Sequence, residues 1–461
     1  MGLLDFASRR VIQPLWARRE DRRAAALRDE LDRRQFDPPA VVRARQVVAL
    51  WRMLRHAAAT VPYYRDLFAR VGFDVGSVQS IDVPDSLPIL TKADIRRHGD
   101  QLVSEAFRGA SLTRKTTSGS TGVPLEVWLD GGGLSWKRAC TLRCDEWSGW
   151  RRGGRVAKVW GNPDYRRHGV KGWLRNALYE RALHLDTLSM TPDAIRQFIA
   201  RFNRMRPELL FGHAHSVYLL ADFVDRLGIK AHRPAGIITT AMVLHDWQRR
   251  RIEATFGCPV TNRYGCEEVS LISCECGEHR GLHVNADSVL VEIVRDGKTA
   301  SPGTPGSIVV TDLSNFAMPL IRYLIGDVGV LADRHCPCGR GSMLLESIEG
   351  READYVVTAD GRLISGISLT ENFAVLVPGV AQIQIVQEQL RRFVFRIVRG
   401  PNWGPASQRK LSDLVSDRFG KGVRFALEFV DLIPQEPSGK YRFCISHVSH
   451  PSAAEGGRIA A

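Results

Sequence analysis

The feature that most constrains this chain is an alternation of short apolar runs with longer amphipathic stretches, between residues 111 and 345. The short runs are rich in β-branched residues, as strands are; they include VAKVWG, LLFG, GIITT, VLVEIV and GSIVVTDL. Stretches with helical periodicity, such as TPDAIRQFIARFNRM and DWQRRRIEATFG, separate some of them. Strands that alternate with helices pack as layers of helix on sheet. The sequence therefore predicts an α/β fold.

The two ends of the chain differ from this central region. Residues 1–60 are rich in Ala, Leu, Arg and Glu and are expected to be helical. After residue 350 the order is different, with β-prone runs (YVVT, RLISG, VAQIQIVQ, RRFVFRIV), a helical stretch (SQRKLSDLVSDRF) and a last strand (VRFALEFV). A chain of 461 residues is too long for one compact core. We predict a large multi-layer α/β domain, 1–350, joined by the hinge IEGREAD to a small mobile α+β domain, 351–461.

The distribution of charged residues along the chain limits the kinds of partner that it is expected to bind. The formal net charge is +14, and the arginines are spread along the chain instead of forming one block. A nucleic-acid-binding protein normally concentrates its charge in a stripe or a recognised module, and none is found here. A dispersed basic surface suits polyphosphate ligands or anionic membranes, and is equally explained by Arg-rich helices in solvent. No run is apolar enough to span a bilayer and no signal peptide is recognised, so a cytoplasmic enzyme is expected.

The first residues, MGLLDFASRRVIQPLWARR, allow two interpretations. Apolar and Arg residues intersperse, as in a segment that docks peripherally on a membrane. The same apolar residues would also serve to cap the core of the large domain, and Pro14 argues against one continuous amphipathic helix. The apolar residues in question are Leu3, Leu4, Phe6, Val11, Ile12, Leu15 and Trp16.

The sharpest local signal is KTTSGSTGVPLEVW. Glycines let backbone N–H groups approach an anion, and hydroxyl groups donate further hydrogen bonds, so such a loop can hold phosphates. The Lys of the ATPase-type loop is absent. Taken alone, such a cluster is more often a flexible loop than a phosphate-binding one. Its residues are Ser118, Gly119, Ser120, Thr121 and Gly122.

Five motifs, of which this loop is the first, occur in a fixed order and indicate the function of the loop. TTSGSTGVP is followed by RYGCEE, RYLIGD, GREAD and SGKYRF, with VPYYRDLF and LPILTKADIR upstream and FGHAHSVYLLA in the middle. This order resembles the acyl-adenylate-forming ligase superfamily, and within it the phenylacetate–coenzyme A ligase and CapK-like (capsular polysaccharide biosynthesis) branch. The resemblance covers nearly the whole chain.

The resemblance implies a role for each motif in binding ATP. The loop 118–122 would hold the β- and γ-phosphates, and Tyr264 would lie against adenine. Asp327 would accept the ribose hydroxyls, and Arg351 would contact ribose or phosphate. Glu268 would ligate Mg²⁺, a hard cation that prefers oxygen ligands.

The resemblance also implies a mechanism. Lys440 would carry a positive charge to the reacting carboxylate and α-phosphate, and Asp354 would be the hinge of the small domain. The expected activity is activation of a carboxylic acid by ATP to an acyl-adenylate with release of pyrophosphate, then transfer to coenzyme A. Transfer to an amine or hydroxyl acceptor is the alternative within the fold, and a non-catalytic nucleotide-binding module is the alternative of another class.

Several positions depart from the superfamily pattern. Leu125 stands where many members have Lys or Arg, and Met242 stands where an acidic residue is common. His213 and His215 stand where aromatic or small residues are usual. If these histidines line the acyl pocket, the substrate is polar or anionic; otherwise they belong to the start of a helix.

Two distant cysteine-rich segments, CECGEHRGLH and HCPCGRG, predict a metal site. Zn²⁺ takes four Cys or His ligands in a tetrahedron, supplied as close pairs. The second segment offers Cys336 and Cys338, and the first offers more ligands than are needed. The resemblance selects Cys276 and His283, leaving Cys274 and His279 outside. With four protein ligands, this Zn²⁺ would brace loops and take no part in catalysis; buried free thiols or a thiol pair that oxidises are the alternatives.

Overall fold

The computed structural model describes residues 8–81, 87–117, 125–161, 169–187, 190–349, 355–359, 363–365, 369, 373, 376–420, 422–433 and 444–448, apart from the side chains of 9–10, 13–21, 117, 349, 355, 363 and 365. The chain forms two compact units, each made of several segments. Unit 1 comprises Met1–Thr117, Leu125–Arg152 and Thr261–Gly350; unit 2 comprises Ser118–Pro124, Gly153–Val260 and Arg351–Ala461. Helices and sheets are mixed throughout, so the predicted α/β class is confirmed.

The N-terminal part of unit 1 is helical, as predicted. Thr91 caps α5 by accepting a hydrogen bond from the Asp94 N–H, and Asp94 bonds back to the Thr91 backbone. Asp130 caps α6 in the same way, by accepting from the Gly133 N–H. The helices of this unit are η1 (Ser8–Ile12), α2 (Gln13–Arg34), α3 (Pro39–Thr60), α4 (Pro62–Val71), η2 (Val75–Ser77), α5 (Lys92–His98), η3 (Gly99–Leu102), η4 (Glu105–Phe107) and α6 (Gly131–Trp147).

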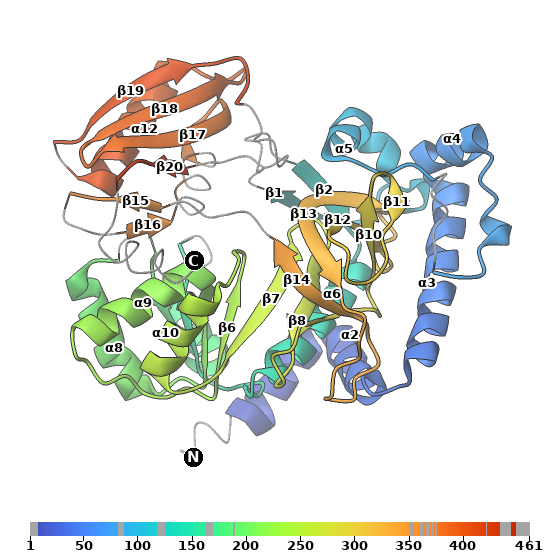
Figure 1. The fold of residues 1–461 in the computed structure, drawn as a ribbon, viewed down its shortest axis with the longest axis horizontal. Coiled ribbons are helices and arrows are strands. Elements are labelled where there is room, and N and C mark those ends of the chain that lie inside the picture. Colours follow the sequence, from blue (N-terminus) through green and yellow to red (C-terminus); the bar gives the residue numbers. More distant parts are fainter. Residues whose placement is uncertain are drawn as a thin grey trace. The chain divides into compact units, whose positions relative to one another are not determined.

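The strands of unit 1 form a two-stranded and a larger antiparallel sheet. In the larger sheet the strand order is β11-β10-β12-β13-β14-β9-β8-β7 (Figure 1). The apolar side chains of several of these strands join those of α3 and α4 in one core. The bounds are β1 (Thr113–Thr117), β2 (Leu125–Leu129), β7 (Val260–Cys266), β8 (Ser270–Glu275), β9 (Leu282–Val284), β10 (Val289–Arg295), β11 (Lys298–Thr299), β12 (Gly306–Asp312), β13 (Tyr323–Leu331) and β14 (Leu344–Glu349).

One part of the sequence prediction needs correction here. Alternation of strand and helix was expected from 111 to 345, but the elements described between 261 and 349 are all strands, paired antiparallel. The physical reason is the length of the connections. Short turns join neighbouring strands into hairpins, whereas parallel strands need a long crossover such as a helix.

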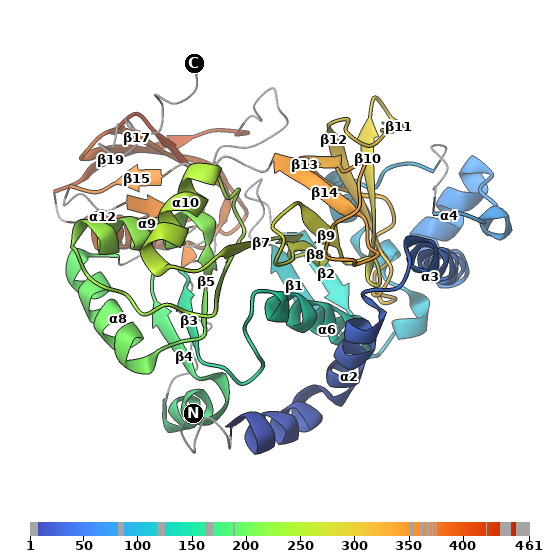
Figure 2. The same ribbon diagram turned by 60° about the horizontal axis from the view of Figure 1, so that its bottom comes forward.

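Strands and helices alternate in the part of unit 2 between residues 153 and 260, as the sequence predicts. Its strands pair in parallel in the order β6-β5-β3-β4, and α8, α9 and α10 lie beside them (Figure 2). Their apolar side chains form a second core. The bounds are β3 (Val156–Val159), α7 (Gly169–Arg175), η6 (Asn176–Glu180), β4 (Ala182–Leu185), α8 (Pro192–Met205), β5 (Leu209–His213), α9 (Ala214–Arg226), β6 (Gly236–Thr240) and α10 (Asp246–Phe256).

The C-terminal part of unit 2 has a core of its own. Strands in the order β19-β18-β17-β20 bury apolar side chains together with α12. The predicted strand and helix runs after residue 350 all form. The bounds are β15 (Tyr355–Val357), β16 (Leu363–Ser365), β17 (Val380–Gln389), β18 (Arg392–Arg399), α12 (Pro405–Phe419), β19 (Arg424–Phe429) and β20 (Cys444–Ser446). The division into domains 1–350 and 351–461 stays a prediction.

The N-terminal segment remains open to both of its interpretations. Leu3, Leu4 and Phe6 lie outside the described residues, as do the side chains of Leu15 and Trp16. The Val11 side chain is 50% exposed, and Ile12 is partly buried. Among the described helices, none has the length and hydropathy needed to cross a bilayer.

Candidate functional site

Two residues assigned to the nucleotide meet in unit 1. Tyr264 lies on β7 and Asp327 on β13, which are distant in sequence. The Tyr264 hydroxyl donates a hydrogen bond of 2.9 Å to Asp327 Oδ2. Both side chains are partly exposed, so they remain accessible to a ligand. The structure thus brings the predicted adenine and ribose residues together as a bonded pair.

A β-bulge directs Tyr264 toward this position. The register of β7 with β8 shifts between Tyr264 and Gly265, and a bulge of this kind re-aims the neighbouring side chain. Gly265 is needed there because a Cβ atom would collide with the Ser270 carbonyl oxygen and lie 3.0 Å from Leu271 Cα. The glycine of the RYGCEE motif therefore allows the close approach of β7 and β8, and the tyrosine of the same motif forms part of the candidate site.

Glu268 follows β7 and is nearly buried, with 5% of its surface exposed. Its Oε1 atom accepts a 2.9 Å hydrogen bond from the Tyr323 hydroxyl. Lys92 Nζ, at the start of α5, lies 3.8 Å from the same oxygen. A buried carboxylate needs partners for its oxygen atoms, and these two groups supply them. The carboxylate is held in one orientation, as a metal ligand must be.

Tyr323 and Lys92 were not assigned a role from the sequence. Both lie within motifs that were recognised, RYLIGD and LPILTKADIR. Their meeting depends on the segment around Leu90, whose backbone exchanges hydrogen bonds with that of Arg322 and Leu324. The spacing of these residues along the sequence gives no indication that their side chains lie close to Glu268.

The remaining nucleotide and catalytic assignments lie outside the described residues. They are Ser118, Gly119, Ser120, Thr121, Gly122, Arg351, Asp354 and Lys440. Their roles stay predictions.

The four predicted metal ligands converge in unit 1. Cys276 follows β8, His283 lies on β9, and Cys336 and Cys338 lie between β13 and β14. One ligand atom from each lies within 4.8 Å of all the others. Three of the four residues are buried and Cys338 is partly buried. Two segments far apart in sequence thus supply one compact set of sulfur and nitrogen atoms.

The spacing of these atoms fits a tetrahedral ion. Cys276 Sγ and Cys336 Sγ are 3.7 Å apart, and Cys338 Sγ is 3.3 Å from His283 Nε2. Bonds of about 2.3 Å to sulfur at tetrahedral angles separate two sulfurs by roughly 3.8 Å. A disulfide would need about 2.05 Å. The geometry suits a shared Zn²⁺ better than an oxidised pair.

The surroundings orient the ligands. His283 Nδ1 shares a hydrogen bond of 3.1 Å with Ser342 Oγ, which leaves Nε2 facing the three sulfurs. Burial, reinforced by the charges of Arg340 and Arg143, lowers the pKa of His283 to about 4, so the ring is neutral at pH 7. Burial opposes ionisation of the Cys338 thiol, but hydrogen bonds with Arg340, Cys336 and Cys276 together outweigh it and lower the Cys338 pKa.

Cys274 and His279, the surplus residues of the first segment, lie outside this cluster. Cys274 packs with Cys144 and Leu271 in a separate apolar group. His279 Nδ1 lies 3.3 Å from Glu275 Oε2. Strand β8 ends at Glu275, so Cys276 leaves the strand and can turn toward His283.

The two unusual histidines lie at the carboxyl end of a parallel strand in unit 2. His213 ends β5 and His215 is the second residue of α9; both are buried. The His213 ring lies 3.8 Å, centroid to centroid, from that of Trp160, which follows β3. His215 Nδ1 shares a 3.2 Å hydrogen bond with Gln248. Ligands of open α/β sheets bind outside the carboxyl ends of the strands, so this edge is a candidate acyl site.

These histidines are neutral. Burial lowers the pKa of His213 to about 4, and burial together with the charge of His245 lowers that of His215 to about 4. Neutral imidazoles would make this edge polar without making it cationic. A polar acyl group fits them better than an anionic one.

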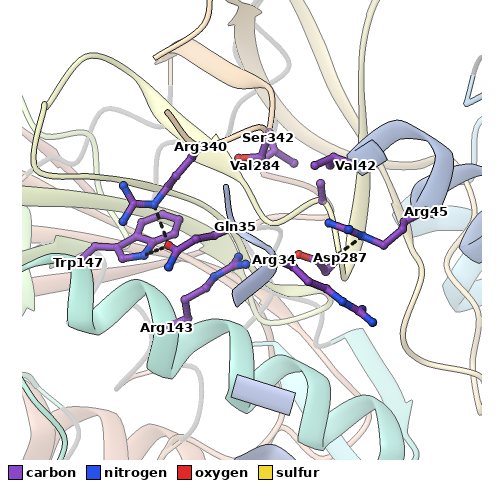
Figure 3. Close-up of a pocket in the computed structure, with 11 residues that line it drawn as sticks. Arg34, Gln35, Val42, Arg45, Arg143, Trp147, Val284, Asp287, Arg340 and Ser342 are labelled. Atoms are coloured by element: carbon purple, nitrogen blue, oxygen red, sulfur yellow. Dashed lines mark hydrogen bonds and ion pairs between the residues drawn. The ribbon is translucent and has the colours of Figure 1, made fainter. Parts of the chain in front are cut away.

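Ser342 and Arg340, which bond to the metal ligands His283 and Cys338, also line a small cavity rich in arginine (Figure 3). Gln35 Oε1 accepts hydrogen bonds from Trp147 Nε1, at 3.0 Å, and from Arg340 Nε, at 2.9 Å. The Arg340 guanidinium also lies 4.4 Å from the Trp147 ring. The free volume is about 10 Å³, roughly the space of one water molecule, so this is no substrate pocket. Its arginines are Arg34, Arg45, Arg143 and Arg340.

Comparisons with known proteins agree with this picture. Residues 356–447 match the CapK C-terminal domain family. Protein CapK of Staphylococcus aureus is 25% identical over 79% of this chain and 80% of its own length. Phenylacetate-coenzyme A ligase of Thermus thermophilus is 26% identical over 69% of this chain and 72% of its own length.

Solved structures give the same fold. A 2-hydroxyisobutyryl-CoA ligase, in complex with 2-HIB-AMP and CoA in its thioesterification state, superposes with a TM-score of 0.59 at 19% identity. The match covers 90% of this chain and 92% of that one. An open conformation of the same ligase gives a TM-score of 0.57 at 18% identity.

Proposed function

This chain is an adenylate-forming ligase of the CapK and phenylacetate-coenzyme A ligase type, and from that premise we propose that it activates a carboxylic acid with ATP and transfers the acyl group to coenzyme A. The first step would join the carboxylate oxygen to the α-phosphorus of ATP and release pyrophosphate. In the second, a thiolate would attack the acyl carbon and AMP would leave.

The bonded pair of Tyr264 and Asp327 is the observation that carries this proposal. The pair unites the second and third of the five ordered motifs in one place. The Tyr264 ring would lie against adenine, and Asp327 would accept the two ribose hydroxyls. The hydrogen bond from tyrosine to aspartate would hold the two groups at a fixed separation, which a rigid nucleoside requires.

Glu268 would hold Mg²⁺ beside the phosphates. Its carboxylate is fixed by Tyr323 and Lys92 before any ligand binds. Mg²⁺ would supply positive charge to the pyrophosphate leaving group. A preoriented ligand lowers the entropy lost on binding the ion.

Lys440 would provide the charge for adenylation. Negative charge develops on the carboxylate and α-phosphate oxygens as pyrophosphate leaves, and an ammonium group placed there stabilises it. The Lys440 loop, after Ser438 and Gly439, would be carried by the small domain 351–461, which turns about Asp354 between the two steps.

Zn²⁺ would be held by the four converging ligands and would brace the sheet. The ligands Cys276, His283, Cys336 and Cys338 fill all four positions, so no site is left for substrate. When bound, the ion supplies structural stability to the connection between β13 and β14.

A second acceptor deserves a separate test because of the similarity to CapK, which covers more of this chain than the phenylacetate-coenzyme A ligase match does. The activated acyl group would then pass to an amine or hydroxyl. Adenylation would be unchanged, and only the second step would differ.

A pyrophosphate-release assay with ATP, Mg²⁺ and a panel of aryl, fatty and amino acids tests the proposal. We expect release that depends on one class of acid, with formation of an acyl-coenzyme A when the thiol is added. Lys440→Ala should lower pyrophosphate release at least about 100-fold while leaving transfer from a preformed acyl-adenylate largely intact. Lys410→Ala, on the exposed side of α12, is the matched control.

Three results would each contradict a part of the proposal. Pyrophosphate release by Lys440→Ala at the wild-type rate would remove the assigned role of that lysine. Absence of release with every acid would remove adenylation itself. Product only with an amine or hydroxyl acceptor would replace coenzyme A by the second candidate.

A further inference from the structure

Helix α7 and its continuation η6 carry a concentrated group of exposed apolar side chains. Across the described residues, 12 large hydrophobic side chains are exposed, and four of them lie within residues 170–178. Their exposed fractions are 81% for Val170, 69% for Trp173, 49% for Leu174 and 37% for Leu178. Apolar groups exposed singly need no explanation, but a contiguous group marks an interaction surface.

The helix packs on the protein with its opposite face. Gly172 is buried, and one turn later Asn176 bonds to the chain that follows. The Asn176 side chain donates to the Ala182 carbonyl at 3.0 Å and accepts from the Ala182 N–H at 2.9 Å. Positions 172 and 176 share one helix face, whereas 170, 173 and 174 lie on the other. Helices of globular proteins normally turn the apolar face inward, and here it is turned outward.

The segment that carries this stripe is basic in sequence, although Arg175 is paired with Glu180. Residues 165–179 contain four Lys or Arg residues and no Asp or Glu. Lys171 is exposed, and Arg175 reaches Glu180 with Nε 2.7 Å from Oε1. The chain as a whole carries a formal charge of +14. An anionic surface is therefore attracted both by this segment and by the protein's overall field.

We propose that the outward face of α7 and η6, formed by Val170, Trp173, Leu174 and Leu178, inserts into the interface of an anionic lipid membrane. Trp and Leu on one side of a helix with Lys and Arg on its flank are the combination found in interfacial helices. The apolar side chains would enter the boundary between headgroups and acyl chains, while Lys171 and Arg175 stay at the headgroups.

A second copy of the chain fits this surface less well. A two-fold contact places the same patch against itself, so Lys171 and Arg175 of each copy would approach those of the other. Two molecules of charge +14 also repel at long range. Neither repulsion arises with an anionic membrane, because its charge is opposite to that of the protein.

Co-sedimentation of the full chain with vesicles tests this inference. We expect pelleting with vesicles of phosphatidylcholine and phosphatidylglycerol, weak pelleting with phosphatidylcholine alone, and release by salt. Leu174→Asp should lower the vesicle affinity about tenfold. Leu390→Asp is the control, because Leu390 is 41% exposed on the turn between β17 and β18 and lies outside the stripe. Lys171→Glu should weaken binding to anionic vesicles only.

The outcomes are decisive in both directions. Loss of affinity in Leu174→Asp but not in Leu390→Asp, with unchanged thermal unfolding, supports the proposal. If Leu174→Asp unfolds early, the milder Leu174→Ser takes its place. Wild-type protein that does not pellet with anionic vesicles overturns the proposal, as does a stripe variant that pellets like the wild type. Concentration-dependent dimerisation that Leu174→Asp abolishes would assign the stripe to a second copy instead, and would also overturn it.

Discussion

A comparison of Cys276→Ser with Cys274→Ser tests which of these two neighbouring cysteines binds the metal. Cys276 Sγ lies 3.7 Å from Cys336 Sγ inside the cluster, whereas Cys274 packs with Cys144 and Leu271 away from it. Both cysteines are buried, so either substitution places a hydroxyl in an apolar site. We expect Cys276→Ser to lose Zn²⁺ and Cys274→Ser to keep it.

The magnitude follows from linkage between binding and folding. Zn²⁺ at about a thousand times its dissociation constant stabilises the folded protein by roughly 4 kcal/mol. Unit 1, which holds the cluster, has about 235 residues. For a unit of this size each kcal/mol shifts the melting temperature by about 2–4 °C, so chelation should lower it by roughly 8–16 °C. The buried hydroxyl alone costs about 1–3 kcal/mol, and that cost falls on both variants.

The assay combines metal analysis with thermal unfolding before and after chelation. The wild type and Cys274→Ser should contain about one Zn²⁺ per chain and melt earlier after chelation. Cys276→Ser should contain none and should not respond to the chelator. The reasoning is refuted if wild-type protein has no Zn²⁺ and freely titratable thiols, or if Cys274→Ser is the variant that loses the metal.

Two further predictions concern the other described site residues. Tyr264→Phe removes the hydroxyl that donates to Asp327 and should raise KM for ATP about five- to tenfold, equivalent to about 1 kcal/mol, with a smaller effect on kcat; an unchanged KM would show that the pair does not contact ATP. His213 and His215 are neutral when folded and titrate near pH 6.5 when unfolded, so the unfolded state binds more protons between about pH 6.5 and 4. The free energy of unfolding should therefore fall as pH falls through that range, by about 1 kcal/mol per pH unit for each histidine, and His213→Gln should flatten the slope in urea titrations at pH 5 and 7; equal slopes would mean that His213 is protonated in the folded protein.

Much of the secondary structure was predictable because its signals are local. The α8 and α10 stretches show helical periodicity, and each apolar run from VAKVWG to VRFALEFV forms a strand. Local periodicity does not specify partners, however. The strands from β7 to β14 were expected to alternate with helices and instead pair antiparallel, because most of the connections between them are only two to six residues long and none carries a described helix.

The sequence by itself determined the class of protein, because five motifs in fixed order are readable without coordinates, and it predicted most of the candidate site residues. Only the tertiary structure decided which of those residues meet. Tyr264 reaches Asp327, and Tyr323 with Lys92 holds Glu268, through contacts between segments far apart in the chain. The outward apolar face of α7 is likewise invisible in the sequence, where the same spacing describes a buried helix. Spacing along a chain gives the face on which a side chain lies, and packing alone determines what that face meets.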